Sequence, residues 1–311
     1  MGMPGGRRSA LLACGLVLAM TACSSAAGSA GPVATSPGSL PGESVPQQKG
    51  PTVLAAAGDI SLRSLGHQRG TARLVERLRP ARVLALGDLQ YPRGDYPAFR
   101  RYYDPTWGRF KDITLPAPGN HEYLTPHAAG YFRYFGDRAR RDGRSYYSVD
   151  VARWHIVSLN SNIAHDGASP QLRWLRQDLA DTSRRCILAF WHSPRFNSGL
   201  EHGNDPSVAP FWHTLYAARA DLVLNGHEHV YERFARQTPT AQVAGGGIRE
   251  FVVGTGGAET YAFGPAEPNS QRQVAGRYGV LRLALRPTSY AWRFVAANDQ
   301  VLDRGGPVTC H

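Results

Sequence analysis

The sequence predicts a layered α/β fold that is built around a mixed β-sheet. From residue 52 onward, short apolar runs alternate with stretches of helical periodicity, and the runs end in polar loops. After residue 248, the chain contains only strand-like runs that are separated by turn residues. About 260 residues follow the N-terminal stretch, which is enough for one large α/β domain or two small ones.

The first half of this body is predicted to alternate strands with a helix. Three apolar runs that end in Gly-Asp or Gly-Asn loops are predicted strands, at 52–59, 82–88 and 113–122. Between the first two runs, Ala72, Val75 and Leu78 recur at helical spacing. Pro80 ends this predicted helix, which covers residues 69–80.

The second half continues the alternation and ends in strands. Residues 146–161 are predicted to form a β-hairpin that turns near Ala152 and Arg153. A helix is predicted to begin after Ser169, a capping residue, with Pro170 at its first position. The remaining predicted elements are strands at 186–193 and 221–229, a helix at 207–220, and strands at 249–257, 278–285 and 289–296.

The N-terminus has the features of an export signal over residues 1–22. Arg7 and Arg8 precede an apolar run that is too short to span a bilayer. The next residues, MTACSS, resemble the lipobox of bacterial lipoproteins, which predicts Cys23 as a lipid-carrying mature N-terminus. Ordinary secretion with cleavage nearby is the alternative. Residues 23–50 are rich in Ser, Gly, Ala and Pro and are expected to form a flexible tether to a single domain at 51–311.

The chain is strongly basic, with a formal net charge of +11. A basic surface attracts anionic substrates or anionic polymers of the cell envelope. The basic residues do not cluster with interleaved aromatic residues, so we expect no nucleic-acid partner. The two cysteines of the body, Cys186 and Cys310, are expected to form a disulfide in an exported protein.

Five of the apolar runs end in side chains that bind metals. In chain order these are Asp59; Asp88 and Tyr91; Asn120 and His121; His192; and His227 and His229. Because ligands gather outside the carboxyl ends of strands in an open α/β sheet, these residues are expected to converge. Each one alone is more often a turn former, a helix cap or a hydrogen-bonded polar group. Together they predict a metal site, with too many ligands for one ion.

This order of motifs resembles the calcineurin-like metallophosphoesterases and, within them, the purple acid phosphatases. The motifs GD, GDxxY, GNH, a strand-end histidine and GHxH are all present between Gly58 and His229. Relatives outside the purple group usually have a histidine two residues after the first aspartate, where this chain has Ser61. Tyr91 fits the purple pattern instead. The resemblance implies a four-layer α/β/β/α sandwich with two mixed β-sheets.

The resemblance also implies a dinuclear metal centre. The first ion would be held by Asp59, Tyr91, His229 and one oxygen of Asp88, and the second by Asp88, Asn120, His192 and His227. A tyrosinate ligand favours Fe(III) in the first site, and the second ion would be Fe, Zn or Mn. A hydroxide held between the ions would attack phosphorus, and His121 or His202 would protonate the leaving group.

Three functions are compatible with this sequence. The leading one is an extracytoplasmic, acid phosphatase-like hydrolase of small phosphomonoesters, secreted or anchored to the membrane through lipid on Cys23. A phosphodiesterase could use the same site, and a non-catalytic protein could use its basic surface to bind envelope polymers. We expect a monomer, because no N-terminal β-sandwich like that of the plant enzymes precedes the predicted domain. Glu122 and Glu228 are further expected to orient imidazoles, and a spacing of two residues predicts extended backbone at His227 and His229.

Overall fold

The computed structural model of the protein describes Gly2, residues 50–64 and residues 66–311. The expected signal segment beyond Gly2, the lipidation candidate Cys23 and the tether up to residue 49 therefore lie outside the described residues. In the part of the chain that the structure describes, no helix is both long enough and apolar enough to cross a membrane.

The first sheet has six strands in the order β13-β12-β11-β1-β2-β3. Its parallel strands are β1 (Thr52–Ala57), β2 (Arg82–Leu86) and β3 (Thr114–Ala117), and its antiparallel strands are β11 (Gly279–Arg286), β12 (Ser289–Ala296) and β13 (Val301–Thr309). β1 pairs in parallel with β2 and antiparallel with β11, so the two halves of the sheet meet at β1. The carboxyl ends of β1, β2 and β3 therefore lie at one edge of the sheet.

The second sheet has seven strands in the order β10-β8-β9-β7-β6-β5-β4. They are β4 (Tyr147–Val151), β5 (Trp154–Ser158), β6 (Cys186–Phe190), β7 (Leu222–Asn225), β8 (Tyr231–Gln237), β9 (Ile248–Val253) and β10 (Ser270–Val274). β5, β6, β7 and β9 run parallel, while β4, β8 and β10 pair antiparallel with their neighbours. Both sheets are mixed, as the sequence predicts.

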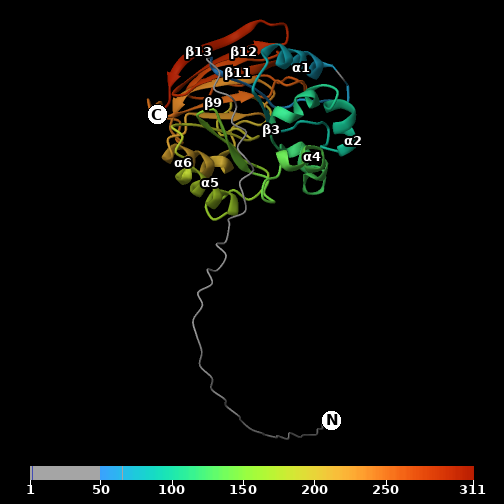
Figure 1. Ribbon diagram of the computed structural model, residues 1–311, viewed down its shortest axis with the longest axis horizontal. Coiled ribbons are helices and arrows are strands. Elements are labelled where there is room, and N and C mark those ends of the chain that lie inside the picture. The colour runs from blue at the N-terminus through green and yellow to red at the C-terminus, as the bar shows by residue number, and fades with distance from the viewer. Residues whose placement is uncertain (1, 3–49, 65) are drawn as a thin grey trace, which may run out of the picture. The chain divides into compact units, whose positions relative to one another are not determined.

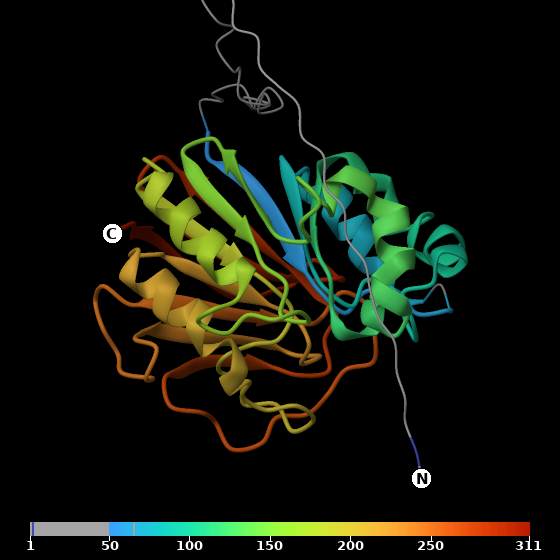
Figure 2. The same ribbon diagram turned by 90° about the horizontal axis from the view of Figure 1, so that it is seen from below.

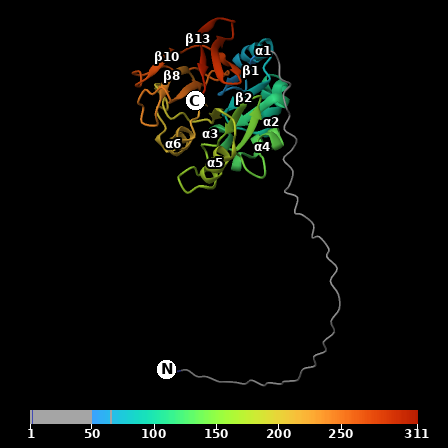
Figure 3. The same cartoon turned by 60° about the vertical axis from the view of Figure 1, so that its left-hand side comes forward.

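Helices lie on the outer side of each sheet, and on the first sheet α1 packs against β1 and β11 (Figures 1 and 2). On the side of the first sheet lie α1 (His67–Leu78), α2 (Tyr96–Ala98), η1 (Phe99–Tyr103), η2 (Trp107–Ile113), α3 (Asn120–Tyr123), η3 (Pro126–Ala128), α4 (Ala129–Phe135) and η4 (Gly136–Arg138). On the side of the second sheet lie α5 (Pro170–Asp181), η5 (Pro206–Val208) and α6 (Ala209–Ala217). The order of layers is helices, sheet, sheet, helices, and Figure 3 shows the same packing from another side.

Strand β6 shows how the apolar pattern builds two cores. Successive side chains of a strand point to opposite faces. Cys186, Leu188 and Phe190 join the core between the sheets, whereas Ile187 and Ala189 join the core beneath α5 and α6. All five are buried, so the sequence of this strand is a continuous apolar run and not an alternation of apolar and polar residues.

Most of the predicted elements are present with shifted ends. The Ser169 side chain accepts a hydrogen bond from the Leu172 backbone N–H at 3.2 Å and caps α5 as predicted. β8, β10 and β13 were not predicted. Cys186 and Cys310 are joined by a disulfide with a Cα–Cα distance of 5.4 Å, which ties the end of the chain to the start of β6.

Candidate metal centre

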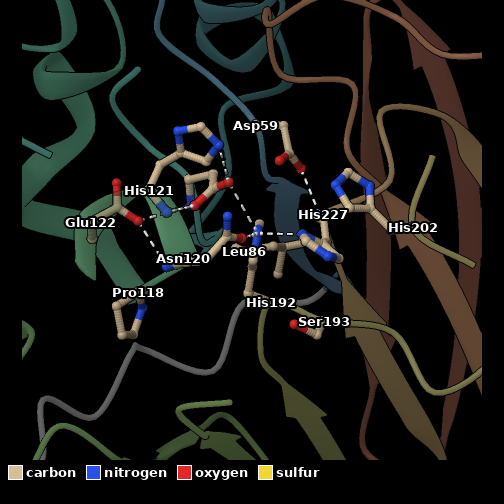
Figure 4. Close-up of polar contacts among 12 residues, drawn as sticks. Asp59, Leu86, Pro118, Asn120, His121, Glu122, His192, Ser193, His202 and His227 are labelled. Atoms are coloured by element: carbon tan, nitrogen blue, oxygen red, sulfur yellow. Dashed lines mark hydrogen bonds and ion pairs between the residues drawn. The ribbon is translucent and has the colours of Figure 1, made fainter. Parts of the chain in front are cut away.

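The carboxyl ends of the parallel strands of both sheets bring the predicted ligands together. Asp59 follows β1, Asp88 follows β2, Asn120 begins α3 after β3, His192 follows β6, and His227 and His229 follow β7. Tyr91 lies in the loop that Asp88 begins. Figure 4 shows Asp59, Asn120, His192 and His227 approaching one another from the two sheets, with His121 and His202 at the periphery.

A first group of donor atoms surrounds the Tyr91 hydroxyl. Its oxygen lies 2.8 Å from Asp59 Oδ1, 3.0 Å from His229 Nε2 and 3.1 Å from Asp88 Oδ2. His229 Nε2 is 3.2 Å from Asp59 Oδ1. Three oxygens and one imidazole nitrogen thus face a common point.

A second group surrounds His192 Nε2. It lies 3.0 Å from Asn120 Oδ1, 3.2 Å from His227 Nδ1 and 3.2 Å from Asp88 Oδ2. Asp88, His192 and His227 also stand out as a metal-type cluster by the mutual approach of their donor atoms. The same oxygen, Asp88 Oδ2, belongs to both groups.

The spacing and orientation of these donors fit two bound cations. Ligand atoms that lie about 2.0–2.2 Å from one cation are separated by about 3 Å from each other. The measured pairs of donor atoms within the two groups lie 2.8–3.2 Å apart. Two of the imidazoles are oriented by carbonyl groups, since His192 Nδ1 donates to the Leu86 oxygen at 2.9 Å and His229 Nδ1 to the Glu259 oxygen at 2.5 Å. This leaves each Nε2 to bind a metal, as in other histidine-metal sites.

The pKa values of these groups reflect burial and the charges of their neighbours, with an excess of negative charge around Tyr91. Burial and the carboxylates of Asp59 and Asp88 raise the pKa of the Tyr91 hydroxyl well above its usual value. Burial lowers the pKa of His192, but Asp88 more than offsets this and the value rises to about 9. Burial and the neighbouring His192 and His202 lower the pKa of His227 to about 2, so that its ring is neutral. A cation would replace the protons that Tyr91 and His192 hold here.

Three of the ligand residues adopt left-handed backbone conformations. The φ angles are 59° at Asp59, 50° at Asp88 and 73° at His227. The prediction of extended backbone at His227 and His229 is therefore wrong, because residues 227–230 form a bend after β7. The bend still sends the two rings to different groups of donors. Non-glycine residues in this conformation are uncommon and cluster at functional sites.

Glu122 braces the backbone that carries the oxygen ligands. Its fully buried carboxylate accepts hydrogen bonds from the backbone N–H groups of Asp88 (2.9 Å), Leu89 (2.9 Å), Gln90 (3.3 Å) and Gly119 (2.7 Å). Burial and the Asp88 carboxylate raise the pKa of Glu122 to about 8, against the N–H donors, which favour its ionised form. The expectation that Glu122 orients an imidazole is wrong, since its hydrogen bonds go to backbone.

Glu228 does orient an imidazole, that of His202. Its buried carboxylate accepts from Asn197 Nδ2 at 3.0 Å and from the backbone N–H groups of Glu201 at 3.3 Å and His202 at 3.0 Å. His202 Nδ1 lies 3.3 Å from Glu228 Oε2, and the ring centroids of His202 and His227 are 3.9 Å apart. His202 is therefore held against the candidate metal centre, and its Nε2 has no hydrogen-bond partner among the described residues.

His121 lies on the opposite side of the centre. Its backbone N–H donates to Asp88 Oδ1 at 2.8 Å, and its Nδ1 donates to the Pro92 carbonyl oxygen at 2.7 Å. Its Nε2 is 3.8 Å from Asp88 Oδ2. The two predicted proton donors thus flank the donor groups, each with one ring nitrogen fixed by the protein.

Tyr261 lies beside the donor groups but was not predicted from the sequence. The Tyr261 ring stacks on His229 with a centroid distance of 4.0 Å and an interplanar angle of 8°, and lies 5.8 Å from His202. Its backbone N–H donates to the His229 carbonyl oxygen at 3.2 Å. Tyr261 is in the irregular segment between β9 and β10, where no periodicity or motif marks it.

Comparison with known proteins identifies the family. The model of the calcineurin-like phosphoesterases matches residues 52–231, more than half of the chain. The chain therefore belongs to the calcineurin-like phosphoesterase family, which confirms the predicted fold class. This family implies a dinuclear metal site.

The curated proteins that are similar to this chain include several plant purple acid phosphatases. Purple acid phosphatase 18 of Arabidopsis thaliana is 29% identical over 213 residues, covering 61% of this chain and 46% of its own length. Purple acid phosphatase 23 of the same plant is 30% identical over 227 residues, covering 60% of this chain and 48% of its own length. Phosphoenolpyruvate phosphatase of Allium cepa is 26% identical over 262 residues, covering 70% of this chain and 52% of its own. The chain spans about half the length of the curated relatives it matches.

Solved structures share the fold. The purple acid phosphatase PPD1 from seeds of yellow lupin (Lupinus luteus) superimposes with a TM-score of 0.66 at 17% identity, over 83% of this chain and 53% of that one. GAP50, the anchor in the inner membrane complex of Plasmodium, superimposes with a TM-score of 0.65 at 13% identity, over 85% of this chain and 90% of that one. One fold thus occurs both in a phosphatase and in a protein described as an anchor, so function has to be argued from the site.

Proposed function

We propose that the protein is a metal-dependent phosphomonoesterase with a two-metal centre that acts outside the cytoplasm. The observation that carries this proposal is the position of Asp88 Oδ2, which is 3.1 Å from the Tyr91 hydroxyl and 3.2 Å from His192 Nε2. A carboxylate oxygen shared by two complete groups of donors is what two adjacent cations require. The named relatives, which are acid phosphatases, support a phosphate ester as substrate.

Asp59, Tyr91 and His229 would hold one cation, and Asn120, His192 and His227 the other, with Asp88 between them. When bound, two such cations make a hydroxide available near neutral pH and neutralise the charge of the phosphoryl oxygens. Tyr91 favours Fe(III) in its own site, and the second site suits Fe, Zn or Mn. The fully buried carboxylate of Asp59 also fixes the ligand loop, because its Oδ2 accepts the His227 backbone N–H at 2.9 Å.

His202 and His121 would manage the proton of the leaving group. An alkoxide leaves poorly without a proton, so a donor must lie within hydrogen-bond reach of it. Glu228 holds His202 Nδ1, which leaves Nε2 to donate, and the Pro92 carbonyl does the same for His121. The His202 side chain is 34% exposed and that of His121 is 30% exposed, so both can reach a substrate.

The extracytoplasmic location is supported by the Cys186–Cys310 disulfide, because disulfides persist in oxidising compartments. Lipid attachment at Cys23 would hold the protein on the membrane, and cleavage without lipid would secrete it. Radiolabelled palmitate incorporation in the wild type and in Cys23→Ala separates these two forms.

A phosphodiesterase that uses the same centre is the alternative hydrolase. The names of the relatives, purple acid phosphatase and phosphoenolpyruvate phosphatase, favour the monoester. A non-catalytic polymer-binding protein is the alternative from another class. It would tolerate the loss of ligands, whereas all seven ligand residues are present and each lies within 3.2 Å of at least one other.

The first experiment measures the visible absorption spectrum, the metal content and the hydrolysis of p-nitrophenyl phosphate on one purified sample. We expect a tyrosinate-to-iron band, about two metal ions per chain and turnover of the ester. His227→Ala should abolish turnover, and His213→Ala, which changes an exposed histidine of α6, should not. A colourless dinuclear enzyme would remove Fe(III) from the Tyr91 site. A metal-free protein that cannot be reconstituted would overturn the proposed activity.

The same sample decides between the two ester classes. Bis(p-nitrophenyl) phosphate is a diester with the same chromophore, so its kcat/KM can be compared directly with that of p-nitrophenyl phosphate. A phosphomonoesterase should prefer the monoester by at least about tenfold, about 1.4 kcal/mol of transition-state binding. Preference for the diester would assign the centre to a phosphodiesterase.

A further inference from the structure

Three arginines form a row across the antiparallel half of the first sheet. Arg282 on β11 is directly opposite Arg293 on β12, and Arg293 is directly opposite Arg304 on β13. Directly opposed residues on neighbouring strands point to the same face of a sheet. Since strands are about 4.8 Å apart, the row spans about 10 Å at its base.

No acidic group neutralises this row within residues 50–64 and 66–311. None of the three arginines takes part in a salt bridge or hydrogen bond there, and Asp303 on β13 instead binds Arg233 and Trp292. Like charges in directly opposed positions destabilise a sheet. Burial and the neighbouring Arg293 lower the pKa of the Arg282 guanidinium.

Helix α1 adds a second line of positive charge beside this row. Arg69, Arg73 and Arg77 are exposed and spaced by four residues, which places them on one face of the helix. Arg77 Nη2 lies 2.8 Å from Asp299 Oδ1, in the turn that joins β12 to β13. The helix therefore borders the strands that carry the row, as Figures 1 and 3 also show. We call Arg69, Arg73, Arg282, Arg293 and Arg304 the basic face.

We propose that the basic face binds a linear polyanion. A destabilising row of like charges becomes favourable once a ligand supplies repeated negative charges at a similar spacing. A polymer fits better than a lipid bilayer, because the exposed large apolar residues among the described ones are Leu124, Leu200, Val243 and Val301. Only Val301 belongs to these elements, so the face has no apolar wedge for insertion into lipid.

The basic face is separate from the metal centre. Its five arginines make no contact with the metal-ligand residues, and they come from α1 and from the antiparallel strands rather than from the carboxyl ends of the parallel ones. Polymer binding and ester hydrolysis should therefore be separable by mutation. The role of the face would be to retain the protein on an acidic polymer while the metal centre stays accessible.

The test measures binding of fluorescently labelled dextran sulfate by anisotropy at low salt. This probe is a linear polyanion without a phosphoester that the metal centre could hydrolyse. We expect Arg293→Gln to weaken binding about fivefold, and Arg293→Gln with Arg304→Gln about twentyfold, from the usual effect of one cation at an anionic surface. Arg176→Gln removes an equal charge from α5, on the opposite side of the sandwich, and should change binding by less than about twofold.

Thermal unfolding provides an independent readout. Without polyanion at low salt, Arg293→Gln should raise Tm by about 1–2 °C, because it relieves the repulsion within the row. Dextran sulfate should raise the Tm of the wild type more than that of this variant. Equal binding by Arg293→Gln and Arg176→Gln overturns the proposal. So does a wild type that binds vesicles with anionic lipid but not dextran sulfate, which would identify a membrane surface instead.

Discussion

The two sheets contribute chemically different halves to the metal centre. The loops after β1, β2 and β3 of the first sheet supply oxygen donors, from Asp59, Asp88, Tyr91 and Asn120. The loops after β6 and β7 of the second sheet supply imidazoles, from His192, His227 and His229. Each half is also oriented by the other: His192 donates to the carbonyl of Leu86 at the end of β2, and the His227 backbone donates to Asp59. The site thus exists only where the two sheets are docked.

Each half contains a buried glutamate, and the two glutamates accept hydrogen bonds from different parts of the site. Glu122 binds four backbone N–H groups around the oxygen ligands, so it supports the position of the metal ligands themselves. Glu228 binds the loop that carries His202, so it supports a partly exposed residue beside the candidate ligands. Removal of the first should damage the fold and the metal site, whereas removal of the second should damage turnover alone.

The largest effect is expected from the ligand that both halves share. Asp88→Asn should lower kcat/KM by more than about 100-fold, beyond the usual effect of losing a residue that only supports a ligand. Metal analysis should show loss from both sites, because Asp88 Oδ2 belongs to both groups of donors. Asp137→Asn, an equal change at an exposed position of η4, is the control. Loss of one ion with the other fully retained would contradict a shared ligand.

The next largest effect is expected at Glu122. An amide in its place turns one acceptor into a donor that faces N–H groups, so Glu122→Gln should lower the free energy of unfolding by about 3 kcal/mol. Urea unfolding of the metal-free protein measures this. Glu76→Gln, at an exposed residue of α1, should change it by less than about 0.5 kcal/mol. If the two variants are equally stable, Glu122 does not brace the oxygen half.

Glu228→Gln is expected to act on turnover. We expect kcat to fall about 10–100-fold, the usual loss for a group that orients a functional histidine, with metal content and KM unchanged. Glu228→Asp, which keeps the carboxylate, should recover part of the rate. If metal content falls in step with activity, Glu228 acts on the ligands His227 and His229 rather than on His202.

The smallest effect is expected at a histidine of the second sheet that lies away from the metal centre. His155 Nε2 is 2.8 Å from Asp178 and its Nδ1 is 3.0 Å from Asp150. Burial lowers its pKa, but these carboxylates more than offset burial and raise it. Its contribution to stability is therefore complete below the unfolded pKa of about 6.5 and is lost as pH rises through the higher folded value.

His155→Gln should accordingly cost about 2 kcal/mol at pH 5.5, where the wild-type ring is charged in both states, and less at pH 9. Urea unfolding at the two pH values measures the difference, and phosphatase activity at pH 7 should be unchanged. Equal losses at both pH values would mean that packing, rather than the ion pairs, accounts for the effect.

The convergence of the candidate metal ligands could be predicted because their positions follow from strand topology. Apolar runs such as 82–86 are readable as strands, and the polar residue after each one must lie at the sheet edge. β13 could not be predicted from its sequence, since Gly305, Gly306 and Pro307 disfavour a strand interior. Its position at the edge of the first sheet makes them tolerable.

Other features depend on tertiary contacts that no local pattern carries. The backbone of Glu122 lies in α3, but its side chain binds the loop after β2. This contact arises because β3, which precedes α3, pairs with β2. Tyr261 reaches His229 from a segment without regular structure. The left-handed conformation of His227 is imposed by the sharp path from β7 to β8 and not by the residue itself, for which it is unfavourable.

The left-handed backbone conformation limits which substitutions the three ligand positions can accept. At Asp59, Asp88 and His227, glycine would suit the backbone better than the residue present, most of all at His227, because aspartate tolerates φ > 0 better than histidine does. Glycine at these positions would relieve the backbone strain, but it would remove the metal-type donors and leave the backbone N–H groups of His121 and His227 without their acceptors, Asp88 and Asp59.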